Sequence, residues 1–182
     1  MKYLYRCIEN FHSPEECKLI LNVLEKNAFE EITDFSSTGH NKFVHTKNCN
    51  IGAVRDVIEK IRHAVIDINR HSFGFTLHEV SNYESVILNQ YKSEHKHEYD
   101  WHADGTLGDC FDLKLTALLN LSQEPYEGGE FEIFINKPEH VTLYDKPGSL
   151  LLFPSFLYHR VKPVTKGTRL TMSQFFLGPS LT

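Results

Sequence analysis

Apolar residues recur at spacings of three and four in two segments of the first half of the chain. The first segment carries Cys17, Ile20, Leu21, Leu24 and Ala28. The second, over residues 52–70, carries Val54, Ile58, Ile61, Val65 and Ile68. This spacing places side chains on one face of an α-helix. We therefore expect two amphipathic helices whose apolar faces are buried in the core.

A start signal precedes the first of these helices. Ser13 suits the N-cap because its hydroxyl can accept a hydrogen bond from an unpaired amide of the first turn. Pro14 fits the first helical position, where its missing N–H costs nothing, and Glu16 can reach back to close a capping box. The sequence therefore predicts a capped helix from this point.

From about Val86 the pattern changes to short runs of β-branched and aromatic residues that are separated by Gly and Pro. The runs cover residues 86–91, 99–104, 113–121, 129–135, 141–144, 149–153 and 168–176. Such runs predict successive strands. Helices followed by many short strands indicate an α+β fold whose second half is a β-sandwich or jelly roll.

No linker, repeat or low-complexity tract divides the chain. We therefore expect a single domain over residues 1–182. Residues 1–85 would form a mainly helical support region, and residues 86–178 a jelly-roll core that carries any catalytic function.

The composition is that of an ordinary soluble domain, since 41% of the 182 residues are hydrophobic and 24% are charged. A chain of this length buries about 70% of its unfolded surface. It needs no metal merely to stay folded, so any metal would serve chemistry. The net charge of −5 and the absence of a basic block argue against a nucleic-acid partner.

The expected location follows from what the chain lacks. It has no run of 18 apolar residues, and its N-terminus lacks the apolar core of a signal peptide. Its cysteines form no CxxC pair and suit reduced thiols; they are Cys7, Cys17, Cys49 and Cys110. We expect a soluble, unexported, cytoplasmic protein with no membrane partner.

Histidine is abundant, with 11 residues, several of them within residues 95–104. His97-Glu98 opens like the zinc-protease motif HExxH, but Trp101 occupies the fifth position and no helix is predicted there. His102-x-Asp104 is different, because side chains two apart on a strand point to the same face. By chance, about every second chain of this composition would contain His-x-Asp, so its meaning depends on its surroundings.

His159 is the best candidate for a third ligand. It follows an apolar strand, and together with His102 and Asp104 it would complete a 2-His-1-carboxylate set. That set holds Fe(II) and leaves three positions open. The alternative for His159 is a core histidine whose ring is bonded to a backbone carbonyl.

Arg169 lies on a predicted strand with a polar face. Arg169 and Thr171 alternate with Leu170 and Met172, so the polar face would point toward a cavity. A carboxylate of a small diacid would match the planar guanidinium, with Thr171 and Tyr91 as hydroxyl donors. The alternative is a surface arginine paired with an acidic neighbour.

These residues resemble the iron(II)- and 2-oxoglutarate-dependent dioxygenases, in particular the branch of prolyl 4-hydroxylases and PKHD-type hydroxylases. The similarity runs from about Ile87 to Gly178. It rests on residues 99–104 (YDWHAD), 115–133 (LTALLNLSQEPYEGGEFEI) and 146–169 (KPGSLLLFPSFLYHRVKPVTKGTR). The order and spacing of these blocks are much harder to obtain by chance than His-x-Asp alone.

The resemblance implies a double-stranded β-helix, a cupin-like jelly roll flanked by N-terminal helices. It implies that His102, Asp104 and His159 are the iron ligands and the catalytic centre. Family members that halogenate lack the carboxylate, so the presence of Asp104 favours hydroxylation.

The resemblance also implies a binding set for 2-oxoglutarate. Arg169 would bind its distal carboxylate, and Tyr91 corresponds to a family tyrosine that serves the same cosubstrate. Asn120 stands where many relatives have a further tyrosine donor, and Thr171 completes the set. Collagen-type prolyl hydroxylases have lysine in place of Arg169, which favours the PKHD-like branch.

The implied function is hydroxylation of an unactivated C–H, with a prolyl (or other) residue of a peptide or protein as substrate and with release of succinate and CO2. The implied cofactors are Fe(II), 2-oxoglutarate and O2, with ascorbate as a candidate reductant. One alternative is an AlkB-like nucleic-acid demethylase, which is disfavoured because residues 171–177 hold no second arginine. The other is a non-catalytic jelly-roll module that binds a metal or ligand.

Other aromatic, histidine and cysteine residues lie close to the His-x-Asp motif in the sequence. We expect Tyr99 and Trp101 to pack in the aromatic core, with lining of the substrate entrance as the alternative. His95 and His97 are expected in a solvent-exposed loop. Cys110 has no base at a recognisable spacing, so no nucleophile is assigned to it.

Substrate specificity would come from loops at the mouth of the barrel. Residues 30–50 and 104–112 are candidates by position only. The sequence leaves the substrate and the oligomeric state open.

Overall fold

The computed structural model describes residues 4–35, 42–50, 52, 54–78, 85–104 and 112–179. The helices are α1 (Pro14–Lys26) and α2 (Arg55–Ile68), which continues into a π-helical turn, Asn69–Phe73. Short 3-10 turns are η2 (Ser93–His95) and η3 (Thr142–Asp145). The strands are β1 (Arg6–Ile8), β2 (Ala28–Phe35), β3 (Lys42–Asn50), β4 (Ser85–Lys92), β5 (Glu98–His102), β6 (Leu113–Asn120), β7 (Glu127–Gly128), β8 (Phe131–Phe134), β9 (Pro138–His140), β10 (Leu150–Pro154), β11 (His159–Val161), β12 (Val164–Lys166) and β13 (Thr168–Leu177).

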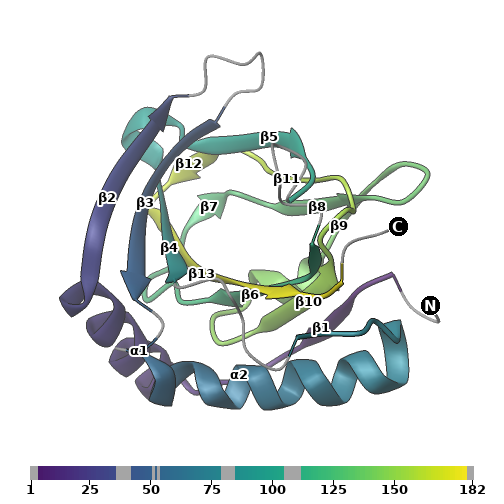
Figure 1. The fold of residues 1–182 in the computed structure, drawn as a ribbon. Helices are drawn as coiled ribbons and strands as arrows, with labels where there is room; N and C mark the ends of the chain where they lie inside the picture. The colour runs from purple at the N-terminus through teal and green to yellow at the C-terminus, as the bar shows by residue number, and fades with distance from the viewer. Residues whose placement is uncertain are drawn as a thin grey trace.

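The main sheet is antiparallel and rolled. Its strand order is β1-β10-β6-β13-β4-β3-β5-β11-β8-β9, and β2 pairs with β3 off this path. A second, two-stranded sheet pairs β12 with β7. Figure 1 shows β5, β11 and β8 facing β6, β10 and β13 across the interior, with α1 and α2 along one side. The result is an α+β fold with a central space enclosed by strands.

Helix α1 begins as the sequence predicts. Ser13 is its N-cap, and Pro14 is its first residue. The Glu16 amide donates to the Ser13 hydroxyl at 3.2 Å, and the Ser13 amide donates to the Glu16 carboxylate at 2.7 Å. Both bonds of the capping box are therefore present.

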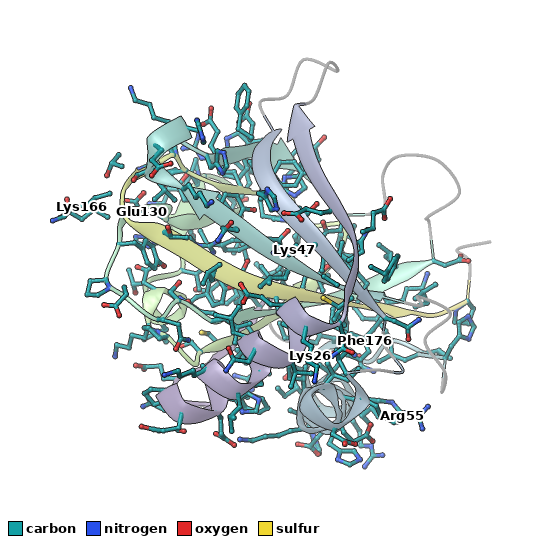
Figure 2. All side chains as sticks on the ribbon, turned by 90° about the vertical axis from the view of Figure 1, so that its left-hand side faces the viewer. Lys26, Lys47, Arg55, Glu130, Lys166 and Phe176 are labelled. Atoms are coloured by element: carbon teal, nitrogen blue, oxygen red, sulfur yellow. The ribbon has the colours of Figure 1, made fainter. Side chains whose placement is uncertain are left out.

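The two helices cover the outer face of the rolled sheet. Their buried residues form one apolar core with β4, β6, β10 and β13, and this core includes Leu24 of α1, Ile61 of α2 and Leu119 of β6. Figure 2 shows both helices on the same side of the strands, with Phe176 of β13 close to α2. The predicted amphipathic faces are confirmed as core.

Strand β13 presents different chemistry to its two sides. Leu170 and Met172 pack with the helical core, whereas Arg169, Thr171 and Ser173 line a cavity inside the rolled sheet. The alternation follows from the two-residue period of a strand. The predicted polar face toward a cavity is confirmed.

The region 1–85, expected to be a mainly helical support region, also contains the strands β1, β2 and β3. Strand β3 pairs with both β4 and β5 and so joins the two halves of the sheet. Its inward positions include Thr46 and Asn48, which line the cavity. A strand with polar residues on its buried face lacks the apolar alternation by which strands are recognised.

The predicted strand at residues 141–144 is also wrong, since Thr142–Asp145 forms the 3-10 turn η3. Val141 and Tyr144 are both buried, whereas Leu143 is 45% exposed. Burial three residues apart fits a turn with three residues per repeat, whereas a strand would bury residues two apart.

Two sequence expectations lie wholly or mainly outside the described residues. Cys110 is one, and the loop 104–112, proposed as a specificity loop, is the other. Within the described part of the chain, no helix is both long and apolar enough to span a bilayer.

The capping box makes a testable contribution to stability. Ser13→Ala removes the hydroxyl that accepts the Glu16 amide, so the free energy of unfolding should fall by about 1 kcal/mol. Urea denaturation followed by circular dichroism measures this change. The control is Leu19→Ala on the same helix, where the side chain is 64% exposed and the change should be near zero. Equal stability of Ser13→Ala and the parent protein would contradict the role of the cap.

Candidate active site

A cavity of about 230 Å³ lies inside the rolled sheet. Its lining comes from β3, β4, β5, β6, β8, β11 and β13, together with the residues that follow β5. Six of the seven residues predicted to form the site line it: Tyr91, His102, Asp104, His159, Arg169 and Thr171. The fold thus brings together side chains that are up to 80 positions apart in the sequence, from Tyr91 to Thr171.

Strand pairing brings the two predicted histidine ligands together. β5 and β11 are antiparallel neighbours, and their register places His159 directly opposite His102. Nε2 of His102 lies 3.8 Å from Oδ1 of Asp104, and Nε2 of His159 lies 3.8 Å from Oδ2. The three ligand atoms all lie within 4.8 Å of one another. They are close enough to bind one ion.

Backbone carbonyls orient both imidazole rings. Nδ1 of His102 lies 2.7 Å from the carbonyl oxygen of Asp100, and Nδ1 of His159 lies 2.8 Å from that of Leu157. A carbonyl only accepts, so Nδ1 donates in both rings, and Nε2 is the nitrogen that faces the Asp104 carboxylate. The alternative of a carbonyl-bonded core histidine therefore describes only one side of the His159 ring, because its Nε2 faces Asp104.

Asp104 is held by contacts that the sequence analysis did not foresee. The residue lies beyond the last residue of β5 rather than within the strand, and its amide donates to the Ser155 carbonyl at 2.9 Å. The Thr116 hydroxyl of β6 donates to Oδ2 of Asp104 at 2.6 Å and lies 3.0 Å from the Ser155 hydroxyl. Thr116 therefore orients the carboxylate from the opposite side of the rolled sheet. Because β6 is buried at every position, no local pattern in the sequence distinguishes Thr116.

The donor set fits a divalent iron ion. Two imidazole nitrogens and one carboxylate oxygen lie within 4.8 Å of one another, and this is the donor set of facial non-haem Fe(II) sites. Each of these groups is itself hydrogen-bonded, as ligands of metal sites usually are. The cavity that the same residues line provides room for further ligands.

Arg169 is the most unusual group at the other end of the cavity. It is 2% exposed, yet it forms no ion pair with any acidic side chain of the described residues. Its guanidinium carbon lies 5.2 Å from the ring centre of Tyr91 and 5.6 Å from that of Tyr144, and Tyr126 forms a side-chain hydrogen bond with it. Burial works against the charge, but the neighbouring phenol groups outweigh it, and the pKa of Arg169 is raised. A buried cation without a counter-ion fits an anionic ligand.

Tyr91 and Thr171 flank Arg169. In the β4–β13 register Tyr91 is opposite Arg169, and Thr171 lies two residues further along β13. Burial raises the pKa of Tyr91 to about 12, although the charge of Arg169 acts in the opposite direction. The Tyr91 phenol is therefore a neutral group at physiological pH. The surface-arginine alternative for Arg169 is excluded by its burial.

Asn120 is hydrogen-bonded to the turn that contains Tyr144. Its amide nitrogen donates to the carbonyls of Tyr144 and Asp145 at 3.0 and 3.1 Å and lies 3.5 Å from the Tyr126 hydroxyl. Its carbonyl oxygen accepts the Ser122 amide at 3.0 Å. These contacts occupy the carboxamide, and Asn120 does not line the cavity. The assignment of Asn120 to the cosubstrate stays a prediction, and in the protein alone its carboxamide is bonded to neighbouring turns.

The expectations for the aromatic residues beside the motif are met in part. Tyr99 lines the cavity, and its ring stacks on that of His102 with centroids 3.5 Å apart. Trp101 packs edge-on against Phe134, and the Arg160 guanidinium lies over its ring at 4.7 Å. Tyr99 therefore matches the alternative of lining the site, whereas Trp101 packs against its neighbours.

The two upstream histidines differ from each other. His95 is exposed, as expected, but His97 is 5% exposed, which contradicts the prediction of a solvated loop residue. The His97 carbonyl accepts the Val164 amide, and its ring stacks on that of His95 with centroids 5.4 Å apart. His97 is buried where it contacts β12, and no local sequence pattern predicts this contact.

Sequence reasoning missed three residues that surround Arg169. Tyr126 and Gly129 belong to the YEGGEFE block, whereas Tyr144 lies in η3. Gly129 has φ +68°, and a Cβ there would lie 2.9 Å from Cδ of Arg169. The glycine is thus needed both for its backbone conformation and to make room for the arginine. The block itself was the available signal, but its contact with Arg169 depends on tertiary packing.

Comparisons with known proteins agree with this geometry. Residues 86–177 match the 2OG-Fe(II) oxygenase superfamily. A PKHD-type hydroxylase of Crocosphaera subtropica is 32% identical over 169 residues, which cover 83% of this chain and 73% of that protein. The alternative of a non-catalytic binding module is therefore wrong.

Solved structures share the fold. A viral collagen prolyl hydroxylase from Paramecium Bursaria Chlorella virus-1, in a 2OG complex, superimposes with a TM-score of 0.69 at 20% identity and covers 97% of both chains. A Trichoplax adhaerens prolyl hydroxylase, in complex with a hypoxia inducible factor peptide fragment, gives 0.70 at 18% identity and covers 96% of this chain and 83% of that one. The chain belongs to the 2OG-Fe(II) oxygenase superfamily, as a PKHD-type enzyme that uses Fe(II), 2-oxoglutarate and O2, and it has the double-stranded β-helix fold of the solved prolyl hydroxylases.

Proposed function

We propose that this enzyme hydroxylates a neutral residue of a peptide or protein, with proline as the first candidate, and converts 2-oxoglutarate to succinate and CO2 in the same cycle. The observation that carries the proposal is that one cavity holds both the His-Asp-His set and the buried Arg169, which has no acidic partner among the described residues. The His-Asp-His set would hold a metal ion at one end of the cavity, and Arg169 provides a positive charge at the other. This arrangement matches a ligand that chelates the metal ion through one of its ends and carries a carboxylate at the other end.

His102, Asp104 and His159 would hold the iron through Nε2, a carboxylate oxygen and Nε2. When bound, Fe(II) supplies the oxygen-activating chemistry on which C–H hydroxylation depends. The protein fixes the ligand orientation in advance, through the carbonyls that accept from Nδ1 and through Thr116 on Asp104. Such prior orientation means that little reorganisation is needed when the metal binds.

Arg169 would bind the distal carboxylate of 2-oxoglutarate, with Tyr91 and Thr171 as neighbouring hydroxyl groups. A guanidinium matches the planar geometry of a carboxylate and remains charged at every physiological pH. The strand register supports this set, because Arg169 is opposite Tyr91 and Thr171 is opposite Asn89 on the same inner face. The apolar residues Leu118, Phe131 and Val161 line the same cavity and limit the access of water.

The remaining cavity wall supports a neutral substrate residue. Apart from the three ligand residues and Arg169, no charged side chain of the described residues lines the cavity. Neutral polar groups there include Thr46, Asn48, Asn89 and Ser173, and Phe175 adds an aromatic surface. Hydrogen-bonding groups beside an aromatic face suit a peptide chain whose target residue is uncharged. The names of the similar hydroxylases support proline as the first candidate.

The AlkB-like alternative has less support. Arg169 is the only arginine that lines the cavity among the described residues, and the chain has a net charge of −5. Binding to a nucleic-acid backbone generally depends on clustered cations.

The central test is an assay of 2-oxoglutarate turnover. Protein loaded with Fe(II) should release succinate from 2-oxoglutarate in air, and the rate should rise with a peptide that is a substrate. A panel of proline-containing peptides, read by mass spectrometry for the gain of one oxygen atom, would identify the residue. The absence of both succinate release and iron-dependent binding of 2-oxoglutarate would contradict the proposal.

Two substitutions separate the ends of the cavity. Asp104→Ala should abolish Fe(II) binding and turnover, because two imidazoles alone remain. Arg169→Lys should leave Fe(II) bound but raise the concentration of 2-oxoglutarate needed for half-maximal rate by about tenfold or more, since lysine cannot bind a carboxylate bidentately. Titration with Fe(II) and succinate assays measure the two effects. Equal loss of iron in both variants would refute the division of roles.

Thr116 can be tested as a positioning residue for Asp104. Thr116→Val keeps the shape of the side chain but removes the hydroxyl that donates to the carboxylate. The affinity for Fe(II) should fall about 10- to 100-fold, as expected when the hydrogen-bond partner of a metal ligand is lost. Thr165→Val, at an exposed position of β12, is the matched control and should bind iron normally. Unchanged iron affinity in Thr116→Val, measured on folded protein, would exclude this role.

A further inference from the structure

Tyr144 has a hydroxyl group that the folded protein leaves without a partner. The side chain lies in η3 and is 1% exposed. Its oxygen is fully buried and has no hydrogen-bond partner among the described residues. Buried hydroxyls are nearly always hydrogen-bonded, because an unpaired one has lost its contacts with water without replacement. The group therefore calls for a partner that the protein itself does not provide.

The position of Tyr144 indicates where that partner would lie. The ring meets Phe131 edge-on, with centroids 5.6 Å apart, and the guanidinium carbon of Arg169 lies 5.6 Å from the ring centre. Phe131 and Arg169 both line the cavity. Burial raises the pKa of Tyr144, and the charge of Arg169 is the strongest influence in the other direction. The phenol thus stays protonated and is able to donate.

The neighbouring hydroxyl is already occupied. Tyr126 forms a side-chain hydrogen bond with Arg169 and lies 3.5 Å from the amide nitrogen of Asn120. Arg169 itself has no carboxylate partner in the described residues. The buried cation at this end of the cavity therefore lies beside a neutral donor, the Tyr144 hydroxyl, that has no partner among the described residues. A carboxylate is the group that accepts from both, whereas a water molecule would leave the cation without a counter-charge.

We propose that Tyr144 donates a hydrogen bond to the distal carboxylate of 2-oxoglutarate, beside Arg169. This inference rests on the proposed function, which assigns that carboxylate to Arg169. It gives Tyr144 the contact predicted for Asn120, whose carboxamide is used to hold the backbone of Tyr144 and Asp145. Asn120 thus positions the tyrosine that contacts the cosubstrate.

Tyr144→Phe tests the proposal by direct binding. The protein is loaded with Mn(II), which occupies the metal site without turnover, and is titrated with 2-oxoglutarate in a calorimeter. The dissociation constant should rise about tenfold, the effect expected for one hydrogen bond to a charged acceptor. Tyr158→Phe is the matched control, because Tyr158 is 54% exposed and undergoes the same chemical change. Its dissociation constant should equal that of the parent protein.

Thermal unfolding without cosubstrate separates a ligand contact from a structural one. Because the hydroxyl is unpaired in the protein alone, Tyr144→Phe should unfold at the same temperature as the parent protein or at a higher one. Added 2-oxoglutarate should then stabilise the variant less than it stabilises the parent. A lower unfolding temperature without cosubstrate would show that a protein group or a water molecule already binds the hydroxyl, and it would overturn the proposal.

The outcomes distinguish this proposal from the one on which it rests. If the parent protein with Mn(II) does not bind 2-oxoglutarate, the proposed function fails. If the parent binds it and Tyr144→Phe binds it within twofold of the parent, the proposed function stands and the role of Tyr144 is refuted.

Discussion

The pairing of β5 with β11 is the constraint on which the site depends. Its register sets His159 opposite His102, and the short segment after β5 brings Asp104 to the same point. Histidine rings on adjacent strands can bind one ion only when they are in register and on the same face, because a shift of one residue would turn one ring to the opposite face. The two backbone carbonyls that accept from Nδ1 then fix the ring orientation. The metal centre is therefore a consequence of sheet geometry.

The two faces of the same strands serve different purposes: one face packs in the apolar core, and the other carries the polar residues of the cavity. On β13, Leu170 and Met172 join the apolar core under α1 and α2, and the alternate residues Arg169 and Thr171 line the cavity. The outward apolar contacts offset the cost of a polar interior, which on its own would destabilise a rolled sheet. This division explains why the helices are packed on the sheet that carries Arg169 and why the cavity can stay polar.

The interior holds two polar groups whose burial is unfavourable in the protein alone. Arg169 has no counter-ion among the described residues, and the Tyr144 hydroxyl has no partner. Burial of both groups is costly in a low-dielectric interior, and the proposed carboxylate of the cosubstrate would give each of them a partner. In the protein alone, Gly129 leaves room for the Arg169 side chain, and Tyr126 forms a hydrogen bond with its guanidinium. The cavity is thus shaped in advance for an anionic ligand.

The sequence by itself determined features whose causes are local: the capping box at Ser13, the alternation along β13, and the ordered blocks that carry His102 and identify the family. Only the tertiary structure decided the partners of these residues. It placed His102 opposite His159 on two neighbouring strands, formed a 3-10 turn beside Arg169 where a strand was expected at Tyr144, and bonded the Asn120 amide to the Tyr144 carbonyl. Local patterns reveal which way a side chain points, but these contacts join segments far apart in the chain and form only when the sheet has rolled up and the helices have packed on it.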